Sequence, residues 1–116
     1  MDPAKLYHLA LAGKWDPAAA EYRGSTIGRT LDEEGFVHCS TAAQLRDTAD
    51  RFYAGRSDVV LLTIDPALVG AEIRVEGGFP HIYGPVPTAA VLNAEAVPAG
   101  PDGRLQLPVP GGRIGG

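Results

Sequence analysis

The feature that most restricts the fold of this chain is the junction at residues 34–44, where a short extended segment leads directly into a helix start. The segment contains Phe36 and Val37, an aromatic and a β-branched residue of the kind that favours a half-buried strand. Thr41, with Gln44 three residues later, matches the capping box of a helix N-terminus. The first amide groups of a helix attract phosphate and carboxylate oxygens, so we expect a binding corner here.

The three histidines of the chain all lie in apolar or aromatic extended stretches. His38 belongs to the junction, His8 lies in an apolar run near the N-terminus, and His81 lies between aromatic residues. A single histidine among hydrophobic neighbours is usually a hydrogen-bonded core residue, and that interpretation stays open for each of them. Because imidazole changes charge near neutral pH, three imidazoles in one pocket would supply acid–base chemistry. We expect the three to converge on one concave surface beside the helix start.

The composition indicates one acidic domain, residues 1–116. A chain of 116 residues with 45% hydrophobic content is long enough for one core and too short for two. The net charge of −4 and the absence of a Lys/Arg run argue against nucleic-acid binding as the main role. A lone cysteine, Cys39, excludes an internal disulfide, and the absence of a signal-peptide pattern predicts a cytoplasmic protein. No apolar run approaches the ~20 residues of a membrane span, and the oligomeric state stays open.

The remaining pattern predicts an α+β fold, because the helices and strands do not alternate regularly. We expect about five to seven strands and two helices. Asp16 and Pro17 predict a short helix ending near Gly24, and a second helix is expected from residue 42 to near Gly55. The expected strands are 5–11, 58–64 with both faces covered, 71–75 at an edge, 79–84 and 89–97, with a weak strand at 105–107. Residues 23–31 and the acidic run 32–34 are interpreted as loops, Trp15, Cys39, Phe52 and Tyr53 as core residues, and residues 98–116 as a weakly ordered tail.

Several of these segments together resemble the bacterial family called domain of unknown function 952. The resemblance covers about residues 5–97 and is carried by Tyr7-His8-Leu9, Trp15, Glu34 to Ser40, the helix from Gln44 to Tyr53, Leu61 to Asp65, Glu76 and Phe79 to Gly84. That family in turn resembles the ADP-ribosyltransferase-like fold, a small split β-sandwich shared by diphtheria-type toxins, poly(ADP-ribose) polymerases and RNA 2′-phosphotransferases. The resemblance implies a ligand similar to NAD or another phosphate-containing nucleotide.

The second resemblance assigns roles to particular residues and also shows two departures. His8 matches the first-strand histidine of the polymerases, residues 35–42 are similar to the segment that covers the nicotinamide, and Tyr83-Gly84-Pro85 is similar to their final block. Leu9 stands where the nicotinamide-binding glycine would be, and the position of the catalytic glutamate falls near Phe79. A transferase needs that carboxylate to stabilise its cation-like transition state, so His81 or Glu76 would have to replace it. In the phosphotransferase version, Arg29 or Arg74 would hold the phosphate.

Three functional hypotheses follow from these residues. The first is an enzyme for a nucleotide-like ligand, with His8, His38 and His81 as catalytic groups and with Glu34, Phe36, Ser40, Thr41, Glu76 and Tyr83 as ligand-binding groups. The second is a module that keeps the pocket but has lost turnover, which the missing glutamate favours. The third is a zinc site that combines the histidines with Glu34 or Glu76, although the histidines show no local ligand spacing.

Overall fold

The computed structural model describes residues 5–25 and 29–107. Within them the chain forms an α+β fold of eight strands and two α-helices, which confirms the predicted class. The strand count exceeds the expected five to seven because three short strands, β2, β3 and β7, are only two residues long. The elements are β1 (Leu6–Leu11), β2 (Glu21–Tyr22), α1 (Leu31–Glu34), β3 (Val37–His38), α2 (Ala42–Phe52), β4 (Val59–Ile64), β5 (Ile73–Glu76), β6 (Phe79–Ile82), β7 (Val86–Pro87) and β8 (Val91–Val97), with single 3₁₀ turns η1 (Ala12–Lys14), η2 (Pro66–Leu68) and η3 (Thr88–Ala90).

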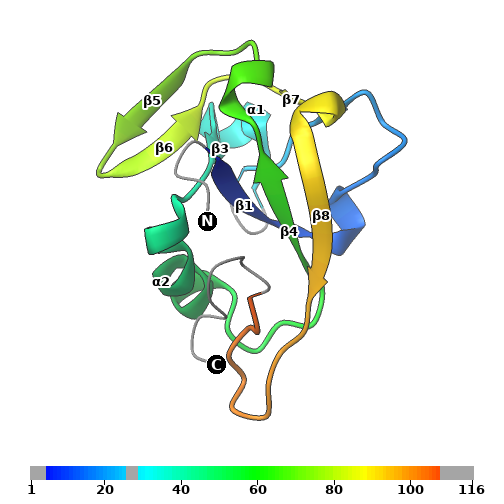
Figure 1. Ribbon diagram of the computed structural model, residues 1–116, viewed down its shortest axis with the longest axis vertical. Helices are drawn as coiled ribbons and strands as arrows, with labels where there is room; N and C mark the ends of the chain where they lie inside the picture. Colours follow the sequence, from blue (N-terminus) through cyan, green and yellow to red (C-terminus); the bar gives the residue numbers. More distant parts are fainter. Residues whose placement is uncertain (1–4, 26–28, 108–116) are drawn as a thin grey trace.

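A three-stranded antiparallel sheet in the order β1-β4-β8 forms the centre of the molecule (Figure 1). Strand β4 lies in the middle and has hydrophobic residues on both faces, because Leu61 and Leu62 point in opposite directions and are both buried. Leu61 packs in a cluster with helix α2, whereas Leu62 packs in a second cluster with β2, β3, β6 and β7. The prediction of a strand covered on both faces is therefore confirmed.

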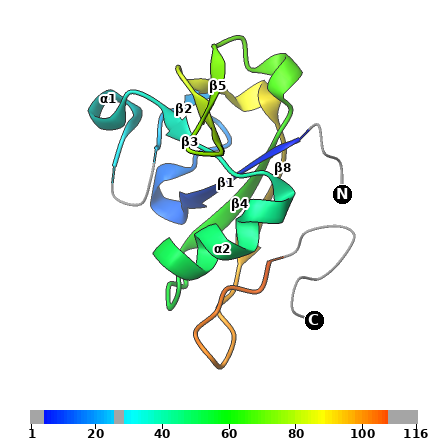
Figure 2. The same ribbon diagram turned by 90° about the vertical axis from the view of Figure 1, so that its left-hand side faces the viewer.

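Helix α2 covers one face of the central sheet (Figure 2). Its start after Thr41 and its end just before Tyr53 agree with the sequence-based prediction. Leu45 and Ala49 are buried against the sheet, and the hydroxyl of Tyr53 donates a hydrogen bond of 2.9 Å to the carbonyl of Leu9. Phe52, expected in the core, is 54% exposed, because Tyr53 fills the space between the helix end and the sheet.

The predicted helix at residues 16–24 does not form. Asp16 does accept a hydrogen bond from the amide of Ala18 at 2.9 Å, but only a turn follows. The chain then becomes extended because Glu21 and Tyr22 pair with Pro87 and Val86 in β7. The first helix instead begins after Thr30, where Thr30 and Glu33 form a capping box in a segment interpreted as a loop.

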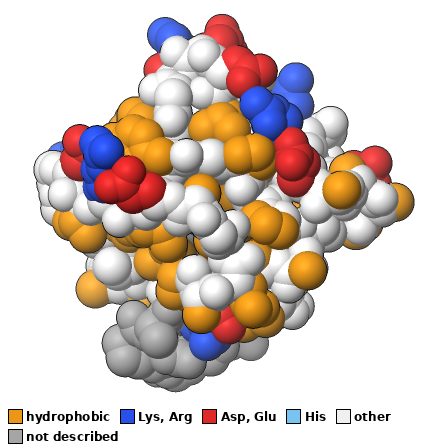
Figure 3. Space-filling view, turned by 90° about the horizontal axis from the view of Figure 1, so that it is seen from above, with side chains coloured by type: hydrophobic (Ala, Val, Ile, Leu, Met, Phe, Trp, Pro, Cys, Tyr) orange, Lys and Arg blue, Asp and Glu red, His pale blue; other side chains and the backbone are white. Residues whose placement is uncertain are grey.

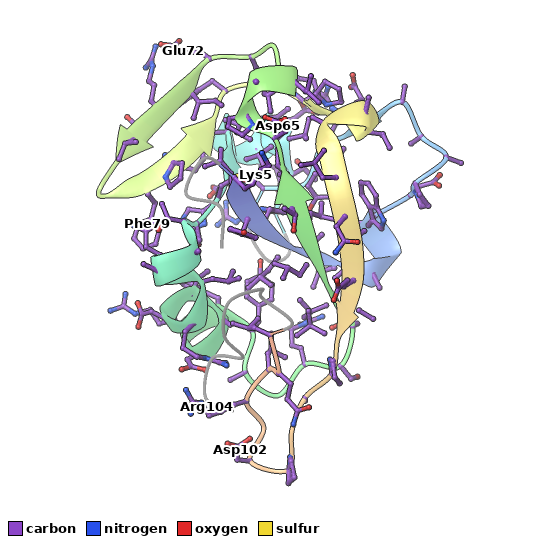
Figure 4. All side chains as sticks on the ribbon, viewed as in Figure 1. Lys5, Asp65, Glu72, Phe79, Asp102 and Arg104 are labelled. Carbon is purple, nitrogen blue, oxygen red and sulfur yellow. The ribbon has the colours of Figure 1, made fainter. Side chains whose placement is uncertain are left out.

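The segment that follows β8 is packed, in contrast to the expected weakly ordered tail. Leu105 and Leu107 are 1% and 2% exposed and belong to the same cluster as helix α2. Arg46 donates to the carbonyl of Leu105 at 2.8 Å, and Arg104 forms an ion pair with Asp50 at 2.9 Å (Figure 4). The segment is therefore held against helix α2 both by the burial of its two leucines and by polar contacts with Arg46 and Asp50. Residues 108–116 of the predicted tail lie outside the described residues.

A second three-stranded antiparallel sheet, in the order β3-β6-β5, projects beside the central sheet (Figure 1). On its inner face Val37, Pro80 and Ile82 are buried toward the core, whereas Val75 on the edge strand β5 is exposed. Two backbone hydrogen bonds between Tyr7 and Ser40, of 2.9 and 2.7 Å, join it to β1. Strand β5 lies at the edge, as predicted. No helix among the described residues is long and apolar enough to cross a membrane.

Candidate functional site

The outer face of the β3-β6-β5 sheet collects most of the predicted site residues. Side chains alternate between the two faces of a strand, so burial of Val37 and Ile82 on the inner side turns the neighbouring residues outward. In the antiparallel register His38 lies opposite His81, and His81 lies opposite Arg74. We use "the outer face" for the set Phe36, His38, Arg74, Glu76, Phe79, His81 and Tyr83.

Aromatic rings form the floor of this face. Phe36 stacks on His81 with centroids 4.0 Å apart and planes 10° from parallel. His38 lies between two further rings, with its centroid 5.2 Å from Phe79 and 5.4 Å from His81. The guanidinium of Arg74 lies 4.8 Å above the ring of Tyr83. Phe79 points toward the start of α2 (Figure 4), where Gln44 donates a 2.5 Å hydrogen bond to the carbonyl of Gly78.

Glu76 holds two of these rings in place. The Nδ1 atom of His81 lies 3.1 Å from the Glu76 carboxylate, and the hydroxyl of Tyr83 donates to the same oxygen. An ionised carboxylate only accepts hydrogen bonds, so Nδ1 of His81 carries a proton and Nε2 is left for a ligand. The side chain of His81 is 12% exposed, whereas that of Glu76 is 47% exposed. The carboxylate therefore fixes both the tautomer and the orientation of His81.

His38 is the less constrained of the two outward imidazoles. Neither of its ring nitrogens hydrogen-bonds to another side chain or carbonyl in the described part of the chain. Partial burial lowers the pKa of His38, the nearby His81 lowers it further, and Glu34 acts in the opposite direction. A lowered pKa keeps this imidazole neutral at pH 7, the form that accepts a proton.

His8 does not join the other two histidines. It is 3% exposed, and both of its ring nitrogens are engaged inside the protein: Nδ1 lies 2.5 Å from the carbonyl of His38 and Nε2 lies 2.7 Å from the hydroxyl of Tyr22. Because a carbonyl only accepts, Nδ1 carries the proton and the Tyr22 hydroxyl donates to Nε2. Burial lowers the pKa of His8 to about 4 and raises that of Tyr22. The expected convergence of three imidazoles on one surface is thus corrected to a pair, with His8 supporting the backbone beneath His38.

The residues that follow His38 also differ from the expected arrangement. Cys39 is fully buried, as predicted, and burial raises the pKa of its thiol to about 12. Ser40, expected on the ligand side, is buried as well, and its hydroxyl lies 2.9 Å from that of Thr48. The strand alternation ends there because Ser40 pairs with Tyr7 of β1. The amide of Thr41 donates to the side chain of Gln44 at 2.9 Å, so the predicted capping box forms and occupies this amide.

The remaining predicted residues lie around the outer face in different ways. Glu34 is half-buried, lies 3.4 Å from Arg29 and interacts electrostatically with His38. Arg74 holds Glu72 with two hydrogen bonds of 2.9 and 3.0 Å at the exposed edge strand. A phosphate would therefore compete with Glu72 for Arg74, whose side chain is 54% exposed.

The described residues contain no group of three or more His, Cys, Asp or Glu side chains that could hold a metal ion. The zinc hypothesis loses its third nitrogen because His8 is engaged on both sides by Tyr22 and His38. On the face shown in Figure 3, acidic and basic side chains lie next to each other in small mixed groups. This distribution gives no broad basic surface there for a nucleic-acid backbone.

Sequence reasoning missed two residues of the site and its support. Phe79 was considered only as the occupant of the glutamate position, yet it contacts His38. Tyr22, which fixes the tautomer of His8, lay in a segment predicted to be helical. For Phe79 a signal was present, since it precedes His81 and Tyr83 at a spacing of two, the period of one strand face.

Comparison with known proteins gives one family and one solved relative. The profile of a family described as "Protein of unknown function (DUF952)" matches residues 11–94. The crystal structure of protein CC0527 from Caulobacter crescentus superposes with a TM-score of 0.77 at 28% sequence identity, covering 89% of this chain and 94% of that one. The solution NMR structure of CC0527 gives a TM-score of 0.71 at 26% identity, with 90% and 93% covered. No curated protein matches the sequence.

Proposed function

The chain belongs to the DUF952 family, whose description assigns no activity, and we propose that the outer face binds and processes a nucleotide-like ligand containing phosphate. The observation that carries the proposal is the pairing of His38 and His81 on adjacent strands, with Glu76 orienting His81. Two imidazoles with unequal surroundings are suited to act as a base and an acid on one substrate.

The two histidines have distinct roles in this proposal. His38 has a lowered pKa and accepts a proton from the attacking group. His81 presents Nε2 to the substrate because its Nδ1 is held by Glu76. A positioned acid or base of this kind contributes about 100- to 10,000-fold to a rate.

The aromatic floor is the part that favours a planar base. Phe36, Phe79 and Tyr83 surround the histidine pair and offer ring faces and edges to a ligand. Stacking of one base on an aromatic side chain contributes ~1–3 kcal/mol. Arg74, exposed over Tyr83, supplies the positive charge for a phosphate once it releases Glu72.

A non-catalytic binding module on the ADP-ribosyltransferase-like plan is the second candidate. It is favoured by Phe79 at the position that resembles the catalytic glutamate and by Glu76, which is already engaged by His81 and Tyr83. Under this alternative the outer face binds the nucleotide but releases no product.

Titration of the ¹⁵N-labelled chain with AMP, ADP-ribose, NAD and inorganic phosphate tests both candidates. We expect amide and imidazole shifts at His38, His81 and Phe36 with the nucleotides, weaker shifts with phosphate alone, and loss of the shifts in His38→Ala and His81→Ala. Val75→Ala is the matched control, because Val75 lies on the same hairpin, is 70% exposed and points to the opposite face.

The same samples separate turnover from binding. Release of nicotinamide from NAD, or of phosphate from AMP by hydrolysis, abolished by His38→Ala, identifies an enzyme. Shifts without product after long incubation identify the binding module. If no nucleotide shifts the outer face at roughly millimolar concentration, the site proposal fails.

A further inference from the structure

Three chemically active side chains form one row across strands β3, β6 and β5, which lie side by side (Figure 1). His38 of β3 lies directly opposite His81 of β6, and His81 lies directly opposite Arg74 of β5. Directly opposed residues of antiparallel strands project from the same face, and neighbouring strands lie about 4.8 Å apart. The row therefore places two imidazoles and a guanidinium next to one another within the outer face.

Aromatic rings lie at both ends of the histidine pair. Phe79 and Tyr83 precede and follow His81 by two residues, so they lie on opposite sides of it along the chain. The ring centroid of Phe79 is 5.2 Å from that of His38, and the ring centroid of Phe36 is 5.7 Å from that of Tyr83. A ligand centred on the two histidines can therefore place one planar base at each end of the face.

The charges of the outer face fit a phosphodiester better than the other bonds of a nucleotide. Arg74 is the one lysine or arginine of the set, which matches the single negative charge of a phosphodiester, whereas a phosphate monoester carries about 1.5 to 2 charges at pH 7. Glu76 is the one acid of the set, and one of its oxygens already accepts from both His81 and Tyr83. No second carboxylate of the set is left to stabilise the cation that forms when a glycosidic bond breaks.

We propose that the outer face cleaves the phosphodiester bond between two ribonucleotides, with the ribose 2′-hydroxyl as the nucleophile, an inference that rests on the proposed function. His38 takes the proton of the 2′-hydroxyl while the 2′-oxygen forms a bond to phosphorus. The bond from phosphorus to the 5′-oxygen breaks, and Nε2 of His81 gives its proton to that oxygen. The products are a 2′,3′-cyclic phosphate and a nucleoside with a free 5′-hydroxyl, and the step consumes no other reactant.

The surroundings of each imidazole match its role. Partial burial and the nearby His81 lower the pKa of His38, which keeps this imidazole neutral at pH 7 and able to accept a proton. The carboxylate of Glu76, 3.1 Å from Nδ1 of His81, balances the charge that His81 carries while both of its nitrogens are protonated. The nucleophile is already attached to the substrate, and well-placed intramolecular groups reach effective molarities of about 10⁵–10⁸ M. A single arginine contacts one phosphate, so the substrate is a short oligoribonucleotide rather than a long RNA.

The nucleophile is tested with the dinucleotide uridylyl-(3′→5′)-adenosine and its counterpart with 2′-deoxyuridine, using ³¹P NMR to detect the cyclic phosphate. We expect cleavage of the ribose substrate alone, and cleavage of both would overturn the proposal. The rate should fall at least ~100-fold in His38→Ala and in His81→Ala. Val75→Ala, whose side chain points to the opposite face, should keep the full rate. A contaminating ribonuclease would act alike in all preparations, so equal rates in the four proteins would also overturn it.

A change of leaving group separates the roles of the two histidines. In uridine 3′-(4-nitrophenyl phosphate) the nitrophenolate leaves without a proton, so His81→Ala should lose about tenfold or less, whereas His38→Ala should still lose at least ~100-fold. Activity of His81→Ala on this substrate shows that the variant is folded, and circular dichroism reports the fold of His38→Ala. Equal losses in the two variants would overturn the assignment of acid and base.

The NMR titrations distinguish failure of this inference from failure of the proposed function. Nucleotide-dependent shifts on the outer face without cleavage of either ribose substrate would overturn the inference and leave ligand binding intact. Absence of the shifts together with absence of cleavage would remove the proposed function as well.

Discussion

His38 and His81 lie directly opposite each other on β3 and β6, with ring centroids 5.4 Å apart. This relationship couples the charge of His38 to its neighbour across the sheet. Glu34 approaches His38 from the chain segment before β3 and has the opposite electrostatic effect. The protonation of His38 is therefore set by residues from two different elements.

Substitution of these two neighbours should move the pKa of His38 in opposite directions. His81→Asn removes the imidazole whose electrostatic effect lowers the pKa of His38, so that pKa rises, whereas Glu34→Gln removes a stabilising negative charge and lowers it. The measurement is an NMR titration of the imidazole Cε1 proton of His38 in each variant. Shifts of the same sign in both variants would contradict the arrangement.

Stability should decrease in mildly acidic solution because His8 is buried as the neutral form. Its pKa is lowered from 6.5 to about 4 in the folded protein, so between these values the unfolded chain binds a proton that the folded chain does not. The free energy of unfolding therefore falls as pH decreases from about 6.5 to about 4, by roughly 3 kcal/mol in total. His38 adds a change of the same sign.

Urea unfolding of the unaltered chain and of His8→Gln, each at several pH values in that range, isolates the contribution of His8. The variant is less stable at pH 7 because it disturbs a buried hydrogen-bonded pair. Its stability should nevertheless change less with pH. Parallel pH profiles for the two proteins would show that His8 is not the titrating group.

Gly24→Ala should destabilise the protein through the ring of Tyr22. A Cβ atom at this position would lie 2.1 Å from the Tyr22 hydroxyl oxygen, which donates to His8. The ring must move and the buried hydrogen bond must break, at a cost of roughly 1–3 kcal/mol. Gly13→Ala is the matched control, because its Cβ would meet nothing within 4 Å. Thermal unfolding of the two variants should differ clearly, and similar melting temperatures would refute the argument.

Leu105→Ala should cost roughly 2–5 kcal/mol although the residue lies beyond β8 in a glycine- and proline-rich region. The reason is that Leu105 is 1% exposed and packs with helix α2 in one of the two core clusters. The exposed neighbour substitution Gln106→Ala should change stability by less than ~0.5 kcal/mol. Denaturant titrations that give the two variants equal midpoints would indicate that this segment contributes nothing to folding.

Local patterns in the sequence were sufficient for the main elements. The apolar run at residues 59–64 is the central strand, and the capping pair of Thr41 and Gln44 starts helix α2. Alternation also accounts for the outer face, because His38, His81 and Arg74 each have inward-facing neighbours in the strand. These features depend on residues close together in the chain.

The features that could not be predicted depend on contacts between distant segments. Asp16 and Pro17 favour a helix locally, but pairing of Tyr22 with Val86 keeps the following residues extended. The local sequence does not distinguish His8 from the other histidines, because its burial depends on a contact with Tyr22 in a different segment. Helix α1 is the exception. The spacing of Thr30 and Glu33 matches a capping box in the sequence itself, although the segment was interpreted as a loop.

Leu61 and Leu62 are adjacent in the chain but belong to different hydrophobic clusters, one with helix α2 and one beneath the sheet that carries the outer face. Strand β4 therefore separates the two hydrophobic clusters, and consecutive residues on it pack in different clusters. A spectroscopic probe attached to the helix would sense the loss of the Leu61 side chain first. A probe on the β5–β6 hairpin would sense the loss of Leu62 first, so substitutions at two consecutive positions perturb the helix-covered half and the half with the outer face separately.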